Sequence, residues 1–166
     1  MMNKRLLIAI IGIVCVLTAF AGNKVDPMYE YEIVSFEGAV APSAGWHVVK
    51  VWSYGKRESL TRENNMKNAV HGVLFKGYPK LGANAGLKAL VPEGYEAHKE
   101  FFDEFFRGKF MQYVQVTNNG NLAAGDVVKI DKKRYKVGMV VVVNVNGLRK
   151  YLEEEKIIEP LDFLFN

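Results

Sequence analysis

Cysteine is almost absent from this chain, because Cys15 is the only one among its 166 residues. It lies in an apolar N-terminal stretch, so the rest of the sequence can form neither a disulfide nor a thiolate metal site. Histidine is scarce too, and the position four residues after both His71 and His98 is a phenylalanine. This spacing gives no local zinc motif, and the sequence predicts no metal and no cofactor.

An excess of one charge is also lacking. The chain has 22 basic and 18 acidic residues, and without Lys4 and Arg5 the basic residues fall to 20, which leaves a formal charge of +2. A balance this weak argues against a nucleic-acid partner. Neither a G-x-S-x-G elbow nor another recognised nucleophile motif occurs, so the sequence gives an enzyme no support.

The first 21 residues predict an export signal. Lys4 and Arg5 are followed by an apolar run over residues 6–18 and by small residues at the two cleavage positions of Ala19-Phe20-Ala21. The run is shorter than the roughly 20 residues that cross a bilayer, which favours cleavage before Gly22. An uncleaved anchor over residues 6–21 is the alternative.

Cys15 raises a second question, whether the chain is a lipoprotein. Val14 stands where lipoprotein processing needs a small residue, and cleavage there would leave the apolar residues 16–20 in the mature tail. We therefore interpret Cys15 as a hydrophobic member of the signal segment.

The remaining chain predicts a flexible lead over residues 22–28 and a single α+β domain over residues 29–166. Alternation predicts strands, and apolar residues at helical spacing, such as Met66, Ala69, Val70, Val73 and Leu74, predict helices. We expect strands over 29–39, 46–54, 111–117, 126–130 and 134–145, helices over 61–75, 95–107 and 147–155, and a glycine-containing loop over 77–92. The order ββααβββα predicts a mostly antiparallel sheet of about five strands with helices packed on one face.

Two clusters are candidate binding surfaces. The first is the phenylalanine group Phe101, Phe102, Phe105 and Phe106, which with Phe110 exceeds what one stripe of a small helix must bury; core packing is the alternative. The second is the set of cations around the last hairpin turn, for which a solvated, solubilising tip is the alternative. Its members are Lys129, Lys132, Lys133, Arg134 and Lys136.

The C-terminal pattern carries a family resemblance. Residues 135–144, Tyr-Lys-Val-Gly-Met-Val-Val-Val-Val-Asn, are followed by Leu148-Arg-Lys-Tyr-Leu152 and Ile157-Ile158. This order resembles the strand-then-helix ending of small exported α/β envelope domains, such as the N-terminal domain of flagellar assembly protein T and small envelope lipoproteins. The chain is also similar to uncharacterised secreted proteins of the Bacteroides group. The resemblance implies a structural protein and carries over no catalytic residue.

Together these features predict an exported, non-enzymatic envelope protein that offers a binding or assembly surface in the periplasm or at the outer membrane. Its expected partner is an envelope protein or a membrane-associated assembly. The alternative is a small-ligand-binding protein or hydrolase whose cleft lies near residues 77–92.

Overall fold

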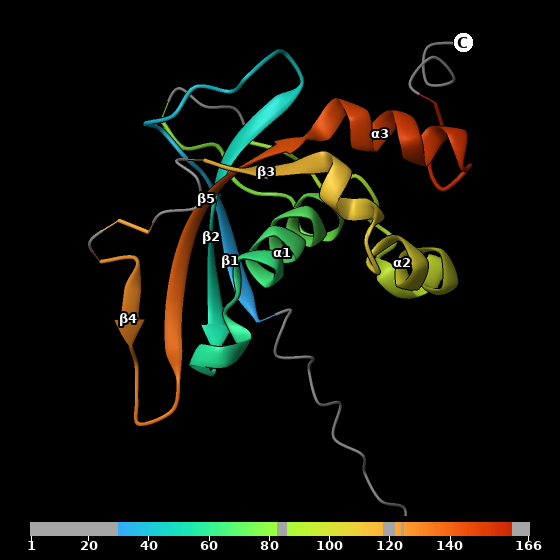
Figure 1. Ribbon diagram of the computed structural model, residues 1–166. Coiled ribbons are helices and arrows are strands. Elements are labelled where there is room, and N and C mark those ends of the chain that lie inside the picture. The colour runs from blue at the N-terminus through green and yellow to red at the C-terminus, as the bar shows by residue number, and fades with distance from the viewer. Residues whose placement is uncertain (1–29, 83–85, 118–121, 124, 161–166) are drawn as a thin grey trace, which may run out of the picture.

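Five antiparallel strands form the sheet in this computed structural model, which describes residues 30–82, 86–117, 122–123 and 125–160. β1 (Tyr31–Ser35) pairs with β2 (Trp46–Gly55), and β2 pairs along its whole length with β5 (Tyr135–Asn144). The other edge of β5 is shared by β3 (Val114–Val116) and β4 (Val127–Lys129). The predicted α+β class and the element order are confirmed (Figure 1).

The strand register sorts side chains between two faces of the sheet, because successive residues of a strand point to opposite sides. Val49 and Val51 of β2 are fully buried on the inner face, opposite Val141 and Met139 of β5. The residues between them, Lys50 and Trp52, point to the outer face and are partly exposed. The run of valines in β5 is buried on both sides, as expected for a central strand.

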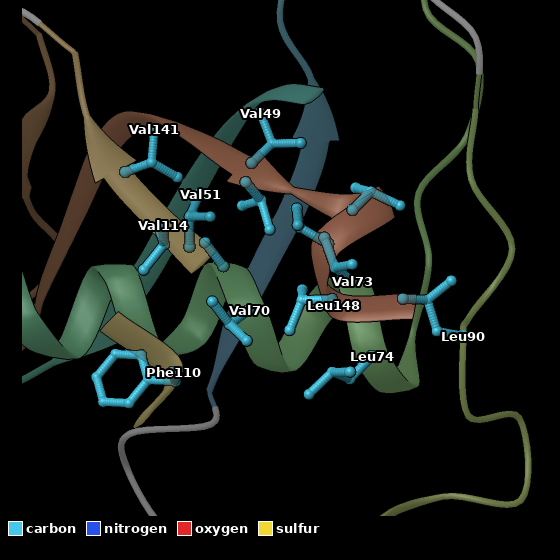
Figure 2. Close-up of a cluster of buried hydrophobic side chains, with 14 of the residues drawn as sticks. Val49, Val51, Val70, Val73, Leu74, Leu90, Phe110, Val114, Val141 and Leu148 are labelled. Carbon is cyan, nitrogen blue, oxygen red and sulfur yellow. The ribbon is translucent and has the colours of Figure 1, made fainter. Parts of the chain in front are cut away.

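Helix α1 (Arg62–Phe75) covers the inner face of the sheet (Figure 1). Thr61, a residue type that N-cap positions favour, is its N-cap, and the Thr61 side chain accepts a hydrogen bond from the Asn64 N–H. Val70 and Val73 pack against the valines of the sheet, with Phe110 and Leu148 closing the layer (Figure 2). Each such buried side chain contributes about 1.5–3 kcal/mol through loss of apolar surface from water.

The predicted helix over 95–107 is shorter in the structure and is split by changes of pitch. A 3-10 turn, η3 (Tyr95–His98), leads into α2 (Lys99–Phe105), and a second 3-10 turn, η4 (Lys109–Tyr113), follows. The last helix, α3 (Val145–Glu154), begins two residues earlier than predicted, because Asn144 is its cap and accepts the Gly147 N–H. All three α-helices lie on the same side of the sheet (Figure 1).

The predicted signal segment and lead over residues 1–28 lie outside the described residues, as do residues 119–120, whose Asn-Gly sequence is typical of a hairpin turn. Among the residues that are described, no helix is long and apolar enough to cross a membrane.

Candidate functional site

The β4–β5 hairpin is held in shape by its own turn. The Asp131 carboxylate accepts hydrogen bonds from the N–H groups of both Lys133 and Arg134, at 2.9 Å each. The Ile130 N–H also bonds the Arg134 carbonyl at 2.9 Å, which closes the loop. Lys132 and Lys133 are therefore presented on an ordered turn at one end of the sheet, the lower end in Figure 1.

The five predicted cations do not form a single patch. Arg134 pairs with Glu30, just before β1, and Lys136 pairs with Glu32 in β1, so two of the cations are neutralised. Lys136 also lies 4.8 Å from the ring centre of Trp52, and its hydrogen bond to Tyr54 raises the pKa of its ammonium. These two residues belong to the outer face of the sheet and are not free to bind a partner.

The other three, Lys129, Lys132 and Lys133, are exposed and form no ion pair within the described part of the chain. Two further cations that sequence reasoning missed join them, because the end of β2 leads into η2 (Arg57–Ser59) beside the hairpin. A shallow cleft of about 410 Å³ is lined by Lys132, Lys133, Lys56, Arg57 and Tyr135.

Large aliphatic side chains are exposed on the same hairpin. β4 pairs with β5 along one edge and is exposed on both faces. Val127, Val128 and Ile130 are 45%, 44% and 48% exposed. The hairpin therefore combines apolar side chains with lysines that pair with no acidic side chain in the described ranges, and we name residues 127–133 together with Lys56 and Arg57 the basic end.

Three of the four predicted phenylalanines lie in the core, which is the core-packing alternative and corrects their assignment to a binding surface. Phe102, Phe105 and Phe106 are at most 4% exposed, and Phe110 is fully buried. The two 3-10 turns redirect the chain around α2, so that rings from successive turns converge on α1 instead of following one helical stripe. Phe102 packs edge-on against Phe75 with ring centres 4.8 Å apart.

Phe101 is the member of that cluster that stays partly exposed. It stacks on Tyr151 of α3 at 5.7 Å and lines a shallow groove of about 620 Å³ between α2 and α3. The rim carries charges of both signs, including Glu104 and Lys109. This mixture gives the groove no preference for a ligand of either charge.

The loop after α1 meets the sheet at the opposite end from the basic end. Gly77 ends the helix with a φ of +66°, and a Cβ there would lie 2.3 Å from the Leu87 carbonyl oxygen. Only glycine fits this close approach, which lets Tyr78 exchange two backbone hydrogen bonds with Leu87. Tyr78 is thereby directed onto the first residues of β2.

A cleft of about 240 Å³ lies between Tyr78 and the ends of β1 and β2. His47 and Ser35 line it, and His47 Nδ1 lies 2.5 Å from the Tyr78 hydroxyl. Burial lowers the pKa of His47 and raises that of Tyr78, so both are neutral. This cleft adjoins the loop over residues 77–92, near which the sequence predicts a cleft. Its histidine is His47, and not His71 or His98.

His71 is partly buried among aromatic rings, and its Nδ1 lies 2.6 Å from the Tyr31 hydroxyl. His98 lies 3.5 Å from Glu93 on the surface. Within the described ranges no three histidine, cysteine or acidic side chains come together as metal ligands.

Comparison with protein-family models, with curated proteins and with solved structures finds no match to this chain. The resemblance to small envelope domains therefore stays a prediction from the sequence pattern.

Proposed function

We propose that the protein is an exported, non-enzymatic envelope protein whose basic end docks on the anionic surface of a membrane. The observation that supports this most directly is the coexistence, on one ordered hairpin, of exposed aliphatic side chains and lysines that form no ion pair with any residue the structure describes. A membrane interface takes up both, because aliphatic groups enter the acyl boundary while lysines and arginines meet lipid phosphates.

The cation spacing suits phosphate groups. Lys132, Lys133, Lys56 and Arg57 surround one shallow cleft whose floor includes Tyr135. Each lysine or arginine near an anionic bilayer contributes about 1 kcal/mol, so these four supply about 4 kcal/mol. The hairpin aliphatics add to this through loss of apolar surface from water.

The place where the chain enters β1 also supports an orientation in which the basic end faces the membrane. β1 begins at Tyr31, whose partner Ser53 lies near the end of β2, and Glu30 pairs with Arg134. The residues before β1 thus join the domain at its basic end. If the apolar run over 6–18 is retained, the segment and the basic end can engage one bilayer; if it is cleaved, the basic end remains.

The test is co-sedimentation of the exported protein with vesicles of phosphatidylcholine, with and without phosphatidylglycerol. We expect binding to the anionic vesicles that weakens as salt is added. The double substitution Lys132→Glu and Lys133→Glu should weaken it at least about tenfold, because two attractive charges become repulsive.

The matched control changes the same charges at the other end of the sheet, by Lys80→Glu with Lys88→Glu, both exposed. It should bind as the unchanged protein does. Equal loss in the two variants, or equal binding to neutral and anionic vesicles, would contradict docking through the basic end. If the protein binds no vesicles and the hairpin crosslinks to an acidic envelope protein, that protein and not the lipid is the partner of the basic end.

A further inference from the structure

We infer that the cleft between β1, β2 and Tyr78 binds a neutral, hydroxyl-bearing ring with the size and chemistry of one sugar unit. The first observation is Ser35, whose side chain is 2% exposed and whose hydroxyl has no hydrogen-bond partner among the described residues. A buried hydroxyl left unpaired costs about 1–3 kcal/mol. Because Ser35 lines the cleft, an oxygen of a bound ligand would supply the missing partner.

The second observation is the pair formed by His47 and Tyr78. Both groups are neutral, so one hydrogen joins Nδ1 and the phenol oxygen. If Tyr78 donates, the other histidine nitrogen carries an N–H; if His47 donates, the Tyr78 O–H stays available. Either arrangement leaves one donor of this pair for a ligand, in addition to the Ser35 hydroxyl.

The walls of the cleft define the rest of the ligand. The aromatic residues Phe36 and Trp46 and the small Ala39 and Ala41 line it, and no charged residue of the described ranges does. An ionised ligand would lose hydration there without meeting a counter-charge. A pyranose suits such walls, because its C–H face packs on aromatic rings while its hydroxyls bond the Ser35 and His47 groups.

The size of the cleft limits the ligand to one ring. A volume of about 240 Å³ lies just below the roughly 300–1,000 Å³ of drug-sized ligand sites.

Saturation-transfer NMR with the full chain tests this, with glucose and N-acetylglucosamine as the probes. We expect transfer to ring protons of at least one sugar. Ser35→Ala should weaken that binding about tenfold or more while the free energy of unfolding stays equal or rises, because the substitution removes an unpaired polar atom. Ala39→Leu, which fills the cleft, should abolish the transfer.

The control is Ser53→Ala, on the same face of the sheet but near its other end. Ser53 accepts a hydrogen bond from Asn68 at 2.8 Å, so its loss should lower stability and leave sugar binding unchanged. Three results would overturn the inference: no transfer from either sugar, undiminished transfer in both cleft variants, or a Ser35→Ala variant that loses more stability than Ser53→Ala. The last would show that the fold already satisfies the Ser35 hydroxyl.

Discussion

At the scale of single residues, His71 shows how burial sets the charge of a side chain. Its ring lies 4.7 Å from Phe75 and 5.9 Å from Phe106, between centres. Burial is the main cause that lowers its pKa from the ordinary 6.5 to about 3, and the positive charges of Lys76 and Lys67 add to the effect. The folded protein therefore holds His71 neutral, while the unfolded chain takes up a proton at mildly acidic pH.

This difference predicts a loss of stability on acidification. Between pH 6.5 and about 3 the unfolded state binds the proton and the folded state does not, so the free energy of unfolding falls by up to about 1.4 kcal/mol per pH unit. His71→Phe, which keeps an aromatic ring in place, should reduce that slope. Denaturant unfolding of both proteins at about pH 7 and about pH 5 measures it.

The comparison of the two proteins is needed because burial also lowers the pKa of His47, which adds a slope of the same sign. Glu32 and Asp103 have lowered pKa values as well, and their contribution is lost at lower pH, as their carboxylates protonate. If His71→Phe leaves the pH dependence of the free energy of unfolding unchanged, His71 titrates normally in the folded state.

At the scale of elements, the end of α1 depends on a glycine for two separate reasons. Gly77 has a positive φ, and its Cα also faces the Leu87 carbonyl so closely that a Cβ would lie 2.3 Å from the oxygen. Gly77→Ala should therefore lower the free energy of unfolding by about 1–2 kcal/mol for the backbone conformation, and further for the clash.

Gly94→Ala separates the two contributions. Gly94 has a φ of +89°, but no atom lies within 4 Å of a Cβ built there. Its ψ of 177° lies in a region that glycine alone adopts readily, so Gly94→Ala shows the cost of a demanding backbone conformation without a clash. A larger loss of stability in Gly77→Ala, measured by thermal or denaturant unfolding, is then due to the clash with the Leu87 carbonyl. Equal losses would mean that the Tyr78–Leu87 pairing relaxes freely around a methyl group.

Elements that repeat a local pattern were predictable from the sequence, and contacts between distant segments were not. Thr61 and the apolar spacing after it indicated α1, and the valine run indicated the central strand β5. The sequence does not decide whether Phe102 is buried, because no periodicity predicts the 3-10 turns that come before and after its helix.

The candidate sites illustrate the same limit. Arg134 and Glu30 are 104 positions apart in the chain, so their ion pair depends on strand order. Ser35, His47 and Tyr78 come from three segments that meet only after β1, β2 and the loop after α1 have packed. A basic hairpin could be found from local sequence, whereas the cleft needed the register of the sheet.

At the scale of the whole molecule, the two candidate sites lie at opposite ends of one strand. β2 begins at Trp46 beside the cleft and ends at Gly55 beside the basic end. Ten residues of strand span roughly 33 Å. A domain docked through its basic end would therefore hold the cleft about one domain diameter away from the bilayer.

This geometry predicts an orientation on the membrane. With Cys15→Ser in the background, a polarity-sensitive dye is attached through Ile130→Cys in one protein and Lys88→Cys in another; both native side chains are exposed. Anionic vesicles should shift the emission of the first dye to shorter wavelength, because the hairpin enters the acyl boundary, and leave the second unchanged. A shift at position 88 alone would reverse the orientation, and equal shifts would show that the protein has no preferred membrane-facing end.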